Sequence, residues 1–199
     1  MIRAIAVTAT ILALSAAHAV AEPVRQLGPH QHGHGTLNLA VEGQTVQMAL
    51  EVPGADIVGF EYEATTAEDQ AKVKAAEEKL ARPLALFVLP GNAGCKVTSA
   101  KVVVARESET DHDAHEHEDE AHAGTEEHDS EEHEAQHSEF HAEYALSCSD
   151  VAAITTISFP YFDAFPNSEE LAVTLITEKS QKGFEVTREH AVIDIRGMM

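Results

Sequence analysis

The sequence has no tryptophan, only two cysteines and few basic residues. Against 13 Lys and Arg stand 34 Asp and Glu, which gives a formal net charge of −21 with histidines neutral. So negative a protein repels nucleic acid and anionic lipid and attracts cations. Two cysteines exclude a zinc site built of four, and no segment beyond the N-terminal one is apolar enough to cross a membrane. We therefore expect divalent metal ions as partners, with no nucleic acid and no membrane span.

Motifs of catalysis are also missing. The sequence contains no H-E-x-x-H and no G-x-S-x-G pattern, and both cysteines have a plausible partner in each other. A flexible loop would not hold a catalytic metal within the tolerance that chemistry requires. We expect a protein that is not an enzyme.

The N-terminus has the pattern of a secretory signal peptide over residues 1–21. Arg3 precedes an apolar run from Ala4 to Leu14, and small residues follow up to Ala21. The apolar part is too short to span a bilayer, and the alternative of an N-terminal core helix fits these flanks less well. We expect an exported protein whose mature part, residues 22–199, forms a single domain.

Hydrophobic periodicity indicates mostly strands. Residues 34–54 alternate in the manner of two strands around a turn at Glu42-Gly43, and residues 170–178 and 190–197 read as two further strands. One helix is expected near Ala67 to Ala81, with Thr66 as N-cap and Pro83 as a stop. About seven strands and one helix favour a mainly β fold, sandwich-like or α+β. The topology does not follow from the pattern.

The two cysteines flank a predicted hairpin. An antiparallel pairing that sets Cys95 opposite Cys148 also sets Val97 opposite Leu146, Ser99 opposite Tyr144 and Val103 opposite Phe140. We expect a disulfide between Cys95 and Cys148, which an oxidising compartment allows; two free buried thiols are the alternative. In the chain-entropy model such a bond contributes about 4 kcal/mol.

A histidine-rich acidic insertion, residues 107–139, lies within that hairpin. It has fifteen Asp or Glu, no Lys or Arg, and hardly any apolar residue, so we expect it to be disordered when empty. Imidazole and carboxylate bind Zn²⁺, and also Ni²⁺, Cu²⁺ and Co²⁺. An acidic linker without metal is the alternative. The expected ligands are His112, His115, His117, His122, His128, His133 and His137, with His141 beside them at the root of the insertion.

A second histidine cluster precedes the first strand. His30, His32 and His34 have period two, so in an extended chain they point to one side, where three nitrogens and one oxygen could bind zinc. Incidental histidines on a mobile tail are the alternative. Because this cluster adjoins a strand, we expect it to bind zinc more tightly than the insertion does.

Several motifs together resemble a known family. "HQHGHGTLNLAVEG", "PGADIVGFEYEATT", "FDAFPNSEELAVTLIT" and the cysteines that flank a His/Asp/Glu loop are similar to the exported zinc-uptake accessory proteins called ZrgA. This resemblance implies periplasmic zinc binding in support of an uptake transporter or its binding protein; sequestration of nickel, copper or cobalt is the alternative function. The family usually has a histidine where Tyr62 stands here, so a folded site must be completed by Glu61, Glu63 or water.

Overall fold

The structure, a computed structural model, describes residues 31–106 and 137–199. The predicted signal peptide, most of the predicted insertion and seven predicted ligands lie outside these residues. The ligands are His30, His112, His115, His117, His122, His128 and His133.

The predicted first hairpin is confirmed. Strand β1 (His34–Glu42) and strand β2 (Thr45–Pro53) pair antiparallel, with Leu37 opposite Leu50 and Leu39 opposite Met48. Gly43 occupies the turn with a φ of 56°, a left-handed conformation that glycine adopts without strain. Alternation therefore determined both the strands and the face that they bury.

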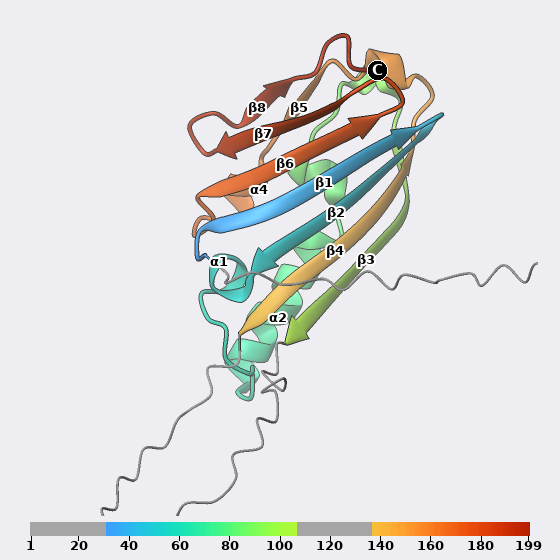
Figure 1. Cartoon of the computed structure of the whole chain (residues 1–199). Coiled ribbons are helices and arrows are strands. Elements are labelled where there is room, and N and C mark those ends of the chain that lie inside the picture. The colour runs from blue at the N-terminus through green and yellow to red at the C-terminus, as the bar shows by residue number, and fades with distance from the viewer. Residues whose placement is uncertain (1–30, 107–136) are drawn as a thin grey trace, which may run out of the picture.

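A six-stranded sheet forms the body of the molecule, in the order β3-β4-β2-β1-β6-β7 (Figure 1). Its outer members are β3 (Lys96–Arg106) and β4 (Ser138–Ser147) on one side, and β6 (Glu170–Thr177) and β7 (Gln181–Thr187) on the other. All neighbours are antiparallel except β1 and β6, which are parallel. Strand β7 was not predicted, because "QKGFEVT" has little apolar alternation.

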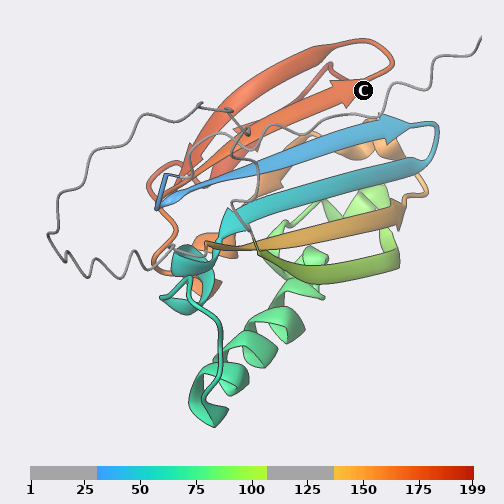
Figure 2. The ribbon, with the colours of Figure 1, turned by 60° about the horizontal axis from the view of Figure 1, so that its bottom comes forward.

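One face of this sheet is buried and the other is open in the described part of the chain. Leu37, Leu50, Tyr144 and Val173 point to the buried face, where α2 and the segment after it cover the sheet (Figure 2). Aromatic side chains fill the space between, with Phe87 stacked on Tyr161 at 5.9 Å between ring centroids. Pairs of this kind are worth about 0.5–1.5 kcal/mol beyond their burial. The mainly β fold expected from the sequence is confirmed.

The helix predicted near residues 67–81 is α2 (Ala67–Leu80). Thr66 is its N-cap, and its side chain accepts a hydrogen bond from the Asp69 N–H at 3.1 Å. Ala76 and Leu80 are buried and Val73 packs partly against the core, as the modest apolar stripe indicated. Pro83 then begins a short helix, α3 (Pro83–Leu86), in a segment whose sequence alone did not decide between strand and helix.

The other elements are short. Helix α1 (Gly54–Val58) follows β2, and α4 (Tyr161–Ala164) precedes β6. The 3₁₀ turns η1 (Gly91–Ala93) and η2 (Val151–Ala153) lie beside each other, and β5 (Thr156–Ser158) pairs with β8 (Val192–Asp194) in a separate two-stranded sheet. Among the described residues, no helix is both long and apolar enough to span a bilayer.

Cys95 and Cys148 form a disulfide where β3 begins and β4 ends. The predicted pairing of Val97 with Leu146 is confirmed, but the pairings predicted further along were wrong by one residue. A β-bulge between Val97 and Ser99 places Ala100 opposite Tyr144 and Val104 opposite Phe140.

The bulge has a physical reason. Without it, Lys101 would pair with Ala142, whose side chain lies on the buried face, and a lysine there would lose its hydration. With it, Lys101 is exposed and Val102 and Val104 pack against the core. Thr98, the extra residue, donates its hydroxyl to the Ala145 carbonyl at 2.9 Å. Such an insertion of one residue is how sheets change the facing of a strand.

The predicted C-terminal boundary of the insertion, residue 139, is also wrong. Ser138 and Glu139 belong to the strand and are buried, although the sequence assigned them to the insertion. The chain therefore enters the fold directly after His137.

Candidate metal site

Three side chains meet at the end of the sheet that lies away from the disulfide. His32 precedes β1, His137 precedes β4, and Glu61 follows α1. Their ligand atoms all lie within 4.8 Å of one another. We call this group the His32–Glu61–His137 site.

A tight turn directs His32 toward this site. The His34 N–H donates to the Gln31 carbonyl at 3.1 Å, and Gly33 has a φ of 85°. A side chain at position 33 would be strained at that angle and would also press on Glu169. The prediction that residues 30–34 are extended, with the three histidines on one side, is therefore wrong where the structure describes the segment. The turn separates His32 from His34.

A glycine and two aromatic rings place Glu61. Gly59 ends α1 in the left-handed conformation, and its N–H donates to the Ala55 carbonyl. Phe60 and Tyr62 then stack on each other with 4.6 Å between their ring centroids. Because residues on either side of position 61 share one side of the chain, the Glu61 side chain points the opposite way, toward the two histidines.

Close packing between β4 and α1 brings in His137. A Cβ atom at Gly54 would lie 2.3 Å from the Ser138 hydroxyl, so only glycine permits this approach. Since Ser138 directly follows His137, the contact fixes His137 beside the segment that contains Glu61. Residues from three separate parts of the chain thus converge.

Glu61 bridges the two imidazoles. Its Oε1 lies 3.0 Å from the His32 Nε2, and its Oε2 lies 2.5 Å from the His137 Nδ1. Burial by itself raises the pKa of Glu61, but the His137 hydrogen bond and the nearby His32 imidazole outweigh it and lower the pKa below its usual value. The carboxylate is therefore ionised at neutral pH.

The donor set fits zinc. Zinc binds imidazole nitrogen and carboxylate oxygen at about 2.0–2.2 Å, so tetrahedral ligand atoms lie roughly 3.3 Å apart. The two separations from Glu61, 3.0 Å and 2.5 Å, are shorter than that value, and all the ligand atoms lie within 4.8 Å of one another. The side chain of Glu61 is 11% exposed, whereas those of His32 and His137 are 64% and 42% exposed. An ion can therefore reach the site from solvent, and water can complete its coordination.

Two predicted ligands lie elsewhere. His34 faces Glu170 at the start of β6, with 3.5 Å between Nδ1 and Oε1. His141 lies 2.6 Å from the Glu139 carboxylate on its own strand and is not one of the three residues of this group. Among the described residues, the His32–Glu61–His137 site is the one group of three such ligands. It takes one histidine from each of the two clusters that the sequence separated.

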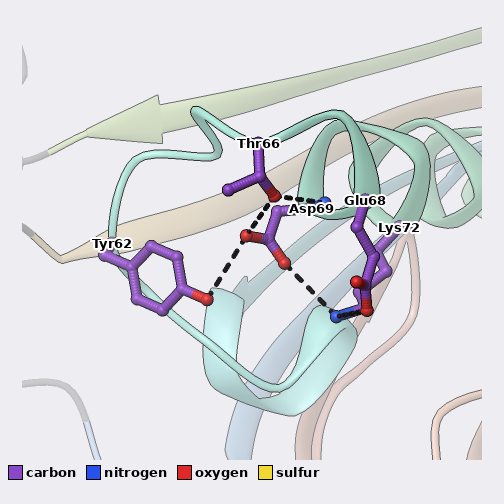
Figure 3. Close-up of polar contacts among 5 residues, drawn as sticks. All are labelled: Tyr62, Thr66, Glu68, Asp69 and Lys72. Carbon is purple, nitrogen blue, oxygen red and sulfur yellow. Dashed lines mark hydrogen bonds and ion pairs between the residues drawn. The ribbon is translucent and has the colours of Figure 1, made fainter.

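Tyr62, which stands where the family usually has histidine, turns away from this group. Its hydroxyl lies 3.5 Å from the Asp69 carboxylate at the N-terminus of α2 (Figure 3). The same carboxylate accepts from Thr66 at 2.8 Å and pairs with Lys72 at 3.2 Å. The Thr66 hydrogen bond is the main reason that the pKa of Asp69 is lowered.

Of the two acidic residues that could complete the site, Glu61 joins it and Glu63 does not. Glu63 pairs instead with Arg106 at 2.8 Å, at the end of β3. The alternation in "FEYE" puts Glu61 and Glu63 on the same side of the chain, so no local sequence signal separates them. Asp56, which is buried beside the site, was not predicted at all, because a lone aspartate in "PGADIVG" has no metal-ligand spacing.

A mainly β fold and a solvent-accessible group of two imidazoles and one carboxylate define a protein equipped to bind a divalent cation. Comparison with known families gives the particular family. The model of the ZrgA family of zinc uptake proteins matches residues 29–195, and the chain belongs to this family. The family is named for zinc uptake, not for a reaction, and its name gives no support to nickel, copper or cobalt. No curated protein matches the chain.

Proposed function

We propose that this protein binds zinc outside the cytoplasm and supplies it to an uptake system, with the His32–Glu61–His137 site as its tight site. The observation that carries the proposal is the convergence of these three ligands at one end of a rigid sheet. A site on folded elements loses less entropy on binding than a site that must order its chain first.

The insertion has a complementary role in this proposal. Its six histidines from His112 to His133, together with its many carboxylates, bind several further ions more weakly and exchange them quickly. Since His137 belongs to both the insertion and the site, ions collected by the insertion are released next to the tight site. The exposed histidines of that site then allow transfer to a transporter or its binding protein.

Export supports the same proposal. Residues 1–21 have the pattern of a signal peptide, and the Cys95–Cys148 disulfide is compatible with an oxidising compartment. A periplasmic location would place the protein where zinc must be captured before it crosses the inner membrane.

Zinc titration of two full-length proteins tests the proposal. In the parent variant, the six histidines from His112 to His133 are replaced by asparagine, so that the insertion keeps its length and carboxylates. We expect this parent variant to bind one zinc ion tightly, while the natural protein binds several. His137→Ala in the parent should weaken that binding by at least tenfold, since even residues behind a metal ligand are worth about 10- to 100-fold.

His141→Ala in the parent variant is the matched control, because it removes an imidazole from β4, the strand that follows His137, without touching the three ligands. It should leave the affinity within about twofold, since it removes no ligand. A parent variant that binds no zinc, or one that loses zinc equally in both substitutions, contradicts the proposed site. Growth of a deletion strain under zinc chelation, rescued by zinc and not by nickel, tests the physiological part.

A further inference from the structure

Both backbone groups of Gly33, which lies between His32 and His34, form hydrogen bonds. Its N–H donates to the Asp56 Oδ1 at 2.7 Å. Its carbonyl accepts from the N–H groups of Glu169 and Glu170, both at 2.8 Å. These three bonds fix the left-handed turn that separates the two histidines, and only the first of them comes from a side chain.

Asp56 lowers the stability of the fold in this position. It is 2% exposed, lies in the first turn of α1, and its Oδ2 has no hydrogen-bond partner. A buried carboxylate with an unsatisfied oxygen costs stability, and native proteins rarely keep one without a reason. The fold alone needs only an acceptor for the Gly33 N–H, which a neutral asparagine would provide.

The charges around Asp56 give such a reason. Burial raises the pKa of Asp56 above its usual value; the Gly33 hydrogen bond and the nearby His32 oppose this rise, and the nearby Glu61 adds to it. Without an ion, the carboxylates of Asp56 and Glu61 repel each other across a partly buried space. A divalent cation held by the three ligands would attract both carboxylates, and this attraction would outweigh their mutual repulsion.

We propose that Asp56 is the positioning residue of the zinc site: it fixes the Gly33 turn that directs His32 toward Glu61 and His137, and it supplies negative charge behind them. This inference rests on the proposed zinc binding. It separates two contributions of one side chain, the hydrogen bond and the charge, which different substitutions remove.

Two substitutions in the full-length parent variant test it. Asp56→Asn keeps an acceptor for Gly33 and removes the charge, and we expect zinc affinity to fall about fivefold. Asp56→Ala removes both, and we expect a loss of about 10- to 100-fold, the range typical of residues that orient metal ligands. With Co²⁺ as a spectroscopic probe, the visible absorption of the bound ion should change in Asp56→Ala and remain in Asp56→Asn.

Asp150→Asn is the matched control. Asp150 also accepts a backbone N–H, that of Ala152 at 3.1 Å, but it is exposed and lies next to the disulfide. It should leave both zinc affinity and the cobalt spectrum unchanged. Urea unfolding without metal provides the stability readout, on which Asp56→Asn should be no less stable than the parent, since it removes a buried charge.

The outcomes separate the two proposals. If the parent variant binds one zinc ion and both Asp56 variants bind it equally well, the role of Asp56 is wrong while the proposed function stands. If the parent variant itself binds no zinc, the proposed function fails and the role of Asp56 fails with it. Should Asp56→Ala not fold, Asp56→Asn still tests the charge, and an affinity equal to that of the parent variant would overturn the proposal that Asp56 both fixes the turn and supplies charge.

Discussion

The two ends of the β3–β4 hairpin are closed in different ways. At the disulfide end, Cys95 and Cys148 join the strands by a covalent bond. At the other end, where β4 begins, His137 and His32 pair with Glu61 through contacts that depend on protonation of the histidines. The first closure is covalent, and under the proposed function the second responds to zinc and pH.

The difference follows from what each end must do. A permanent closure stabilises the fold whatever the surroundings, because it restricts the unfolded chain. An end that receives and releases an ion needs ligands that can exchange water, a proton and a metal. The rigid sheet between the two ends keeps the exchangeable ligands in place when no ion is bound.

Removing the disulfide should have the largest effect on stability. Cys95→Ser with Cys148→Ser opens a loop with a sequence separation of 53 residues, and the free energy of unfolding should fall by about 4 kcal/mol. Urea unfolding without metal measures it. Because the end where β4 begins is built by other contacts, zinc affinity at 25 °C should stay within about twofold. A large loss of affinity in a folded variant would show that the two ends are coupled.

Zinc should raise the free energy of unfolding of the parent variant, and acid should reduce that increase. At a free zinc concentration about one hundred times the dissociation constant, the stability gain is about 2.7 kcal/mol. Protons compete with zinc for imidazole, so at pH of about 5.5 the gain should shrink, while the disulfide's contribution persists.

Glu61 is not the source of this acid effect. Its lowered pKa means that it is still ionised at pH of about 5.5, so its own stabilising pairing is lost only at lower pH, as the pH falls through its folded-state pKa. The loss of zinc near pH 5.5 must therefore come from the histidines. Equal zinc-induced stabilisation at pH of about 5.5 and 7.5 would show that carboxylates alone bind the ion.

His34→Ala should have a small effect, although the sequence groups His34 with His32. His34 faces Glu170 in a partly exposed pair, and solvent-screened pairs contribute about 0–1 kcal/mol. In the parent variant, calorimetry should therefore give a zinc dissociation constant within about fivefold of the unsubstituted parent. A loss as large as that of His137→Ala would make His34 a ligand and would require a different turn at Gly33.

Tyr62→His should have the smallest effect, although it restores the residue usual in the family. Tyr62 is 58% exposed and points to Asp69, away from Glu61, so an imidazole there does not reach the ion. Stability should change by no more than about 0.5 kcal/mol, as is usual for surface substitutions. Zinc affinity, measured by competition with a chelator, should be unchanged. A tenfold gain would mean that the segment rotates and that position 62 is a ligand position.

Local sequence signals predicted the elements well and their pairing only in part. Alternation located β1, β2, β4 and β6, and Thr66 with Pro83 located α2, because these signals act between near neighbours in the chain. The pairing of β3 with β4 was right only as far as Val97. The bulge beyond it depends on whether Lys101 can reach solvent, and that depends on which face of the sheet is covered.

The candidate site, too, was predictable from the sequence only in part. The sequence by itself determined the ligand chemistry, which is an excess of imidazole and carboxylate. It also determined the cysteine pair, which leaves no thiolate as a ligand. Only the tertiary structure decided which ligands act together. The parallel pairing of β1 with β6, the turn at Gly33 and the close approach of Gly54 to Ser138 bring His32, Glu61 and His137 together. Spacing along the chain cannot reveal that meeting, because contacts between distant segments are set by the packing of the whole sheet.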